Sequence, residues 1–211
     1  MAPSSLELTY FDAGGRADPI RMMLIYGDIA FEDIRIPSAE FADKKPSLDL
    51  PFDQVPTLNV EGKVFAQSIA IARYGAKMTG LYPEDALKAL EADLAVDTVT
   101  EATMTVINAA FQEQDEEKKK VLLAEANEKI LPRLLGGLEK RAVGPYYLGD
   151  TPSFPDFYVL DFHKQLWSVL PDVITLKPED YPKLIAIADS LRSSSKLSAF
   201  INPKKRKLSS A

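Results

Sequence analysis

The chain has 211 residues, 46% hydrophobic and 27% charged, which is typical of a globular protein with one or two domains. Its formal net charge of −6 disfavours nucleic acid as a bulk partner, and the absence of cysteine excludes disulfides, thiolate metal sites and cysteine nucleophiles. With no apolar run near the roughly 18 residues of a membrane span and no signal-peptide pattern, we expect a cytoplasmic protein that uses no membrane and no metal.

Strand and helix patterns alternate through the first third of the chain. The predicted elements are a strand over 6–11, a helix over 17–26, a strand over 31–36, an irregular polar stretch over 37–53, strands over 57–60 and 63–65, and a helix over 67–77. This order predicts a small mixed sheet with helices on both faces.

Long helical patterns dominate from Glu84 onward. They cover residues 86–110, 116–141 and 155–170. Ser153 and Asp156 form a capping-box pattern before the last of these runs, which indicates a structural role at the helix start and not a catalytic one. The single histidine, His163, lies in an apolar helical stretch, where packing is a more common role than catalysis. We therefore predict an α/β domain over 1–80, a short linker, and an all-helical domain over 86–211.

Tyr10 ends the first predicted strand and precedes a glycine-containing turn and a helix. A phenol in this position can hold an anion such as a thiolate, although tyrosine is also common as a plain strand aromatic. Gln67 and Ser68 open a later helix, whose N–H groups can attract a carboxylate or can simply be capped by the serine. The Val55–Pro56 pair before a strand is either a cis bond beside a site or an ordinary strand start.

Five motifs in order support the first reading of each feature. They are Leu-Thr-Tyr-Phe at 8–11, Gly-Arg-Ala at 15–17, Gln-Val-Pro at 54–56, Gln-Ser-Ile-Ala-Ile-Ala-Arg-Tyr at 67–74, and Ser-x-x-Asp-Phe-Tyr at 153–158. Over residues 6–200 the chain strongly resembles a cytosolic glutathione transferase, most closely the sigma class. The resemblance implies a thioredoxin-like N-terminal domain, a helical C-terminal domain that lines the electrophile site, and conjugation of glutathione, as co-substrate, to hydrophobic electrophiles by a homodimer.

The resemblance also implies the residues of the site. Tyr10 would be the catalytic group, whose hydroxyl stabilises the glutathione thiolate. The glutathione-binding residues would be Tyr10, Phe11, Arg16, Phe41, Lys45, Gln54, Val55, Gln67, Ser68 and Glu101. Within this set, Val55 would pair with the cysteinyl backbone, Gln67 and Ser68 would hold the γ-glutamyl carboxylate, and Glu101 would reach the glutathione of the neighbouring subunit.

Some positions depart from the family pattern. Phe41 stands where the family often has Trp, and Glu101 where it usually has Asp. Gly14 and Asn108 replace an arginine and a tryptophan of the prostaglandin D synthase branch, which weakens the case for that isomerase activity. A glutathione-dependent isomerase or peroxidase remains an alternative, as does a non-catalytic carrier or a crystallin-like structural relative.

The segment Pro203–Leu208 places four consecutive cations after a proline. Such a run is typical of a short nuclear import signal, while a solvated C-terminal tail is the more frequent meaning.

Overall fold

The computed structural model describes residues 3–201, which divide into two compact units on either side of the Tyr82–Pro83 bond. The basic segment Pro203–Leu208 lies outside the described residues. Within residues 3–201, none of the helices combines the length and the apolar character needed to cross a membrane.

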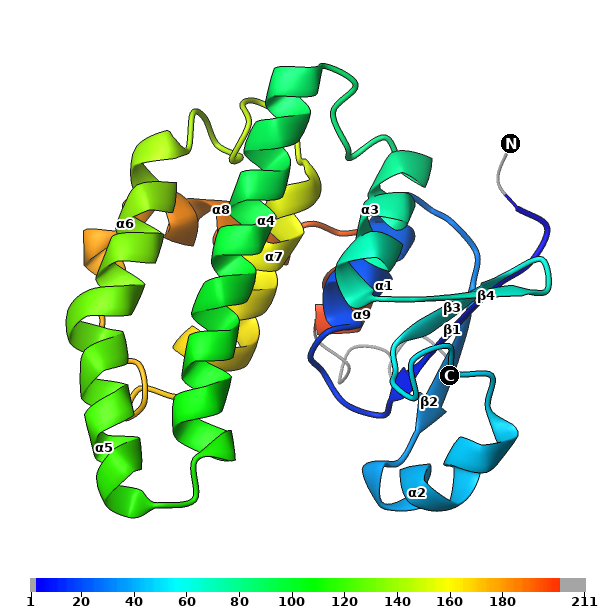
Figure 1. Ribbon diagram of the computed structural model, residues 1–211. Helices are drawn as coiled ribbons and strands as arrows, with labels where there is room; N and C mark the ends of the chain where they lie inside the picture. The colour runs from blue at the N-terminus through cyan, green and yellow to red at the C-terminus, as the bar shows by residue number, and fades with distance from the viewer. Residues whose placement is uncertain (1–2, 202–211) are drawn as a thin grey trace, which may run out of the picture. The chain divides into compact units, whose positions relative to one another are not determined.

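Unit 1 contains a four-stranded sheet with helices and short helical turns (Figure 1). Its elements are β1 (Leu6–Phe11), α1 (Asp18–Tyr26), β2 (Glu32–Ile36), η1 (Ser38–Glu40), α2 (Phe41–Lys44), η2 (Lys45–Ser47), β3 (Thr57–Val60), β4 (Lys63–Ala66) and α3 (Ser68–Met78). The strand order is β2-β1-β3-β4. The β1–β2 pair is parallel, while β1–β3 and β3–β4 are antiparallel.

Both longer helices of unit 1 lie on one face of this sheet. Leu8 and Tyr10 of β1 point to that face and are buried there. The guanidinium of Arg21, on α1, lies over the ring of Tyr10. Leu58, the partner of Leu8 across the β1–β3 pair, lines a groove together with Ile71 of α3. The sequence predicted helices on both faces without assigning a helix to either one, and the structure places α1 and α3 on the same face. Periodicity shows that a helix has an apolar side but not which face of the sheet that side covers.

The stretch 37–53 is also more regular than its polar composition predicts. It contains η1, α2 and η2. Each has only three or four residues, which is too short for a helical repeat to be visible in the sequence.

The regular elements in the described part of unit 2 are helices, with one isolated β-bridge between Tyr146 and Gly149. Its elements are α4 (Ala86–Ile107), η3 (Asn108–Gln112), α5 (Glu116–Glu125), η4 (Ala126–Ile130), α6 (Leu131–Arg141), α7 (Phe154–Phe162), η5 (His163–Trp167), η6 (Pro178–Asp180), α8 (Pro182–Arg192) and α9 (Ser198–Ile201). The predicted run 116–141 corresponds to α5, the π-helical turn η4 and α6 in direct succession. Pro132 follows that turn, at the start of α6, where its missing N–H is tolerated.

A buried carboxylate organises the start of α7. Asp156 is fully buried and accepts hydrogen bonds from the N–H of Tyr147 and from the N–H and hydroxyl of Ser153, each at 2.7 Å. The predicted capping box is present. Burial raises the pKa of the Asp156 carboxyl to about 6, although these donors favour the charged form. The side chain thus joins the loop before α7 to the first turn of the helix.

We expect Asp156→Asn to lower the free energy of unfolding by about 2 kcal/mol, because an amide nitrogen would face donors that now meet an oxygen. Urea unfolding followed by circular dichroism measures this change. Glu117→Gln, which breaks an exposed ion pair with Lys120, is the control and should cost less than about 0.5 kcal/mol. Equal losses in both variants would contradict the structural role of Asp156.

A second buried polar contact joins η5 to α8. His163 is 9% exposed, and an Arg192 guanidinium nitrogen lies 2.6 Å from its Nδ1. Because arginine can only donate, Nδ1 must accept, and the imidazole is neutral with its proton on Nε2. Burial, followed by the charge of Arg192, lowers the pKa of His163, while Asp189 opposes this shift.

A lowered pKa in the folded state means that the unfolded chain binds more protons below pH ~6.5, so stability falls as the pH falls through that value. We expect the difference in unfolding free energy between wild type and His163→Asn, whose amide oxygen can replace Nδ1, to shrink between pH 7.5 and 5.5. Urea unfolding at several pH values tests this. A difference that is constant with pH would show that His163 does not titrate differently in the two states.

Candidate active site

The proposed catalytic tyrosine stands at the end of β1, where the chain leaves the sheet. Alternation along the strand turns Tyr10 toward α1, and the side chain is 8% exposed. Its hydroxyl oxygen accepts a hydrogen bond from the backbone N–H of Arg16 at 3.3 Å. An oxygen that accepts one bond in this way can still donate its own proton.

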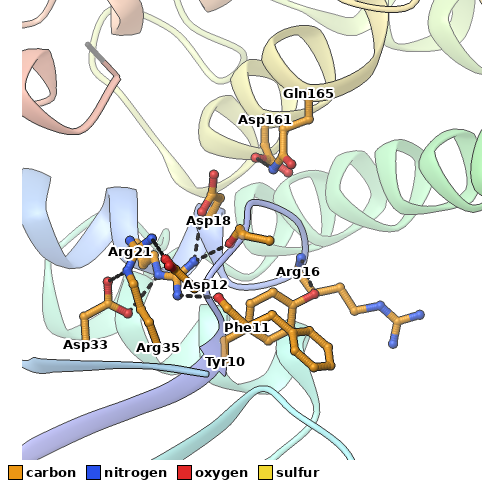
Figure 2. A network of polar contacts seen from close by, with 11 residues as sticks. Tyr10, Phe11, Asp12, Arg16, Asp18, Arg21, Asp33, Arg35, Asp161 and Gln165 are labelled. Carbon is orange, nitrogen blue, oxygen red and sulfur yellow. Dashed lines mark hydrogen bonds and ion pairs between the residues drawn. The ribbon is translucent and has the colours of Figure 1, made fainter. Parts of the chain in front are cut away.

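The turn between β1 and α1 fits closely around this hydroxyl (Figure 2). Gly15 has φ +113°, a backbone conformation that side chains rarely adopt, and a Cβ there would lie 3.1 Å from the Tyr10 oxygen. Glycine is thus required both by backbone conformation and by proximity. The turn can therefore present the next N–H, that of Arg16, to the phenol.

Burial raises the pKa of Tyr10 above its usual value, while the Arg16 N–H and the charges of Arg16 and Arg21 oppose the rise. The phenol is therefore protonated at neutral pH. A protonated phenol is a hydrogen-bond donor, which is the form needed to stabilise an anion.

Three aromatic rings follow one another beside the turn. The Phe11 ring is edge-on to Tyr10, with centroids 5.1 Å apart, and edge-on to Phe41 of α2, with centroids 5.0 Å apart. Such geometry is favourable for aromatic pairs. The structure therefore brings together three of the predicted site residues from two separate segments.

A second group of predicted residues lines one pocket. Arg16, Gln54, Val55, Gln67 and Ser68 all contribute to its wall. The remaining lining residues are Phe52, Pro56 and Ala66. The Val55–Pro56 bond is cis. The pocket thus joins the turn after β1, the segment before β3 and the start of α3 within unit 1.

The backbone at the start of α3 has an uncommon conformation. Gln67 has φ +73°, which is unfavourable for a residue with a side chain, and such outliers gather at functional sites. Its side chain makes no capping hydrogen bond to the residues that the structure describes. A helix that begins without a side-chain cap presents its first N–H groups to an acceptor, and an anion is the most favourable one.

Two of the predicted residues are engaged elsewhere. Lys45 forms a 3.5 Å ion pair with Asp53, next to Gln54 in sequence, and does not line the pocket among the described residues. Glu101 lies on α4 in unit 2 and accepts a hydrogen bond from Arg133 at 2.9 Å.

Two further residues belong to this region and were not predicted. Phe52 lines the pocket and is 61% exposed. The sequence feature that could have indicated it is a large apolar side chain in a polar stretch. Arg21 is fully buried against the turn after β1, and its signal was a cation among the apolar residues Ile20 to Leu24. Sequence alone could not say what a buried cation would contact.

Together these residues form a donor-rich surface. A phenol O–H, the pocket wall and an uncapped helix start can receive a ligand that carries more than one anionic group. With no cysteine in the chain, a sulfur nucleophile could come only from that ligand.

Comparison with known families gives two matches along the chain. Residues 6–77 match the family described as "Glutathione S-transferase, N-terminal domain", and residues 101–204 match "Glutathione S-transferase, C-terminal domain". The predicted family and the predicted fold, a thioredoxin-like domain followed by a helical domain, are confirmed.

Relatives and solved structures agree with these matches. The chain is 37% identical over 200 residues to the hematopoietic prostaglandin D synthase of Mus musculus, covering 92% of this chain and 94% of that protein. It is 30% identical over 201 residues to glutathione S-transferase S1 of Drosophila melanogaster, covering 93% and 78%. The structure of a prostaglandin synthase D of Nilaparvata lugens is similar, with a TM-score of 0.82 at 30% identity over 93% of this chain and 96% of that one. The chain is therefore a member of the glutathione S-transferase family.

Proposed function

We propose that this protein is a glutathione transferase that conjugates the glutathione thiolate to hydrophobic electrophiles, as in detoxification. The observation that carries the proposal is the Tyr10 hydroxyl, held by the Arg16 N–H in the same unit as the pocket at the start of α3. We place the activity in the cytoplasm, since the reduced glutathione pool lies there.

The chemistry requires a deprotonated thiol. A free thiol has a pKa of roughly 8.5 and is mostly protonated at neutral pH. A hydrogen bond from Tyr10 to the sulfur favours the thiolate and lowers the pKa of the thiol, whose proton passes to solvent. The thiolate then forms a carbon–sulfur bond with the electrophile, and the leaving group departs with the electron pair of the bond that breaks.

The remaining residues would bind the rest of the tripeptide. The backbone of Val55 would pair with the cysteinyl unit, and Gln67 and Ser68 would hold the γ-glutamyl carboxylate. The uncapped start of α3 supports this assignment, because its N–H groups favour an anion. Gln54 would line the glycine end.

The remaining predicted residues complete the proposed site. Lys45 and Phe41 would lie beside the glycine end of glutathione. The ring of Phe11 would pack between the rings of Tyr10 and Phe41. Arg16 would add positive charge near the thiolate. Glu101 would contact the glutathione of a partner subunit.

We propose a homodimer, for which unit 1 offers a surface. A groove of about 200 Å³ runs between the β3–β4 hairpin and α3, with an almost wholly apolar lining. Phe65 and Tyr74 at this groove are 43% and 38% exposed, which is unusual for large rings outside an interface. A structural relative from Necator americanus, 29% identical with a TM-score of 0.76 over 94% of this chain and 97% of that one, is described as monomeric. Sedimentation distinguishes the proposed dimer from a monomer.

A second candidate function is glutathione-dependent isomerisation that forms prostaglandin D. The 37% identity to the mouse hematopoietic prostaglandin D synthase favours it. Gly14 and Asn108, where that branch has arginine and tryptophan, oppose it. Direct assay of prostaglandin D formation distinguishes the two functions.

Removal of the Tyr10 hydroxyl tests the main function. We expect Tyr10→Phe to lower kcat/KM for conjugation of 1-chloro-2,4-dinitrobenzene by about 10–100-fold, because a hydrogen bond to a charged group contributes about 1.5–3 kcal/mol. Tyr26→Phe, a half-buried tyrosine of α1, is the matched control and should retain full activity.

Equal and substantial activity in wild type and Tyr10→Phe would show that Tyr10 is not the activating group. Retention of the wild type on a glutathione column without any turnover would favour a carrier. Failure to bind glutathione would favour a structural protein.

Sedimentation tests the dimer. We expect wild type to have about twice the 23.3 kDa mass of one chain, and Phe65→Glu to shift it toward the monomer by placing a charge in the apolar groove. Phe111→Glu changes a ring that is 56% exposed outside the groove and should leave the mass unchanged. A monomeric wild type would contradict the dimer and, with it, the contact proposed for Glu101.

A further inference from the structure

Arg21 is a fully buried cation on α1, and its guanidinium is surrounded by oxygen acceptors (Figure 2). Its Nε donates to a carboxylate oxygen of Asp33 at 2.9 Å. One terminal nitrogen donates to the carbonyl of Ala13 at 3.0 Å and to Asp18 at 3.1 Å. The other donates to the carbonyl of Phe11 at 3.3 Å. Burial of a charge is tolerated only when it is paired and hydrogen-bonded in this way.

Two of these acceptors belong to the turn that positions the phenol. The carbonyl of Phe11 lies at the end of β1 and that of Ala13 in the turn that follows, and the Arg16 N–H that contacts the Tyr10 hydroxyl lies at the end of the same turn. Arg21 therefore binds the start of the turn from the protein interior, and the Tyr10 hydroxyl accepts a hydrogen bond from the end of the turn. A displacement of the start would also move the Arg16 N–H that donates to the phenol.

Arg21 also contacts the phenol ring itself. The guanidinium carbon lies 5.7 Å from the centroid of the Tyr10 ring, within the range of a cation–π interaction. The cation thus supports both the backbone that surrounds the hydroxyl and the ring that carries it.

The acidic partner of Arg21 is held in place in turn. Asp33 lies on β2, and its second carboxylate oxygen accepts from Nε of Arg35 at 2.8 Å. Arg35 extends to Asp12, in the turn after β1, at 3.3 Å. The network therefore returns to the turn. Among these side chains, that of Arg21 is fully buried and the others are partly exposed.

We propose that Arg21 is a positioning residue for Tyr10: its planar fork fixes the turn over residues 11–16 so that the Tyr10 hydroxyl is aimed at the glutathione thiolate. This inference rests on the proposed function. Arg21 acts through the turn and the ring, and we assign it no contact with glutathione. A lysine has the charge but not the fork, so it cannot span the Phe11 and Ala13 carbonyls and Asp33 together.

The test compares wild type with Arg21→Lys. The ultraviolet absorbance of the bound thiolate, followed against pH, measures the pKa of the glutathione thiol in the complex. We expect Arg21→Lys to raise this pKa by about one unit and to lower kcat/KM at neutral pH about tenfold. The KM for glutathione should change less than about twofold, because the groups proposed to bind the carboxylates are untouched.

The matched control is Asp156→Asn, which weakens the fold of unit 2, whereas the turn belongs to unit 1. It should lower stability and leave the thiol pKa unchanged. An Arg21→Lys protein that loses stability but has a wild-type thiol pKa would overturn the inference, since Arg21 would then be merely structural. A wild type that does not lower the thiol pKa at all would overturn the proposed function as well.

Asp33→Asn decides the matter if Arg21→Lys does not fold. This change leaves the guanidinium and its two carbonyl contacts in place but removes the charged anchor of Nε. We expect a smaller rise in the thiol pKa in the same direction, because the fork is less firmly held. Loss of an anion near a cation would by itself make the surroundings of Tyr10 more positive and lower the thiol pKa. An unchanged or lowered value would therefore exclude positioning.

Discussion

A guanidinium can be buried only where acceptors surround it, and the turn after β1 is arranged around that requirement. Arg21 donates hydrogen bonds to two backbone carbonyls and two carboxylates, so the strand, the turn and the helix that contribute these acceptors must pack against one another. Gly15 then allows the returning chain to approach the phenol. The position of the Tyr10 hydroxyl follows from these constraints.

In the proposed function, the protein and its ligand supply different chemical groups. The chain has no cysteine, so sulfur chemistry depends on a thiol that is brought in. The protein supplies donors: a phenol that burial keeps protonated and a helix start without a side-chain cap. Donors that are fixed before the ligand arrives favour charge without reorganisation at the moment of reaction.

Much of the fold follows from local patterns. The strands over Leu6–Phe11 and Thr57–Val60 agree with their predicted limits because alternation and turn residues are local signals. The capping box at Ser153 and Asp156 was visible for the same reason. The short turns over residues 38–47 were missed because three or four residues contain no helical repeat.

The sequence by itself determined the family, and through it the residues proposed for the site, among them the tyrosine near the end of the first strand and the pair at the start of α3, since motifs preserve residue type and order. Only the tertiary structure decided that α1 and α3 share one face, that Phe52 lines the pocket and that the Arg21 guanidinium lies over the Tyr10 ring. These facts depend on contacts between residues distant in sequence, such as Arg21 with Asp33 and Leu8 with Leu58. A buried charge is stable only when such partners converge, and no local pattern encodes that convergence.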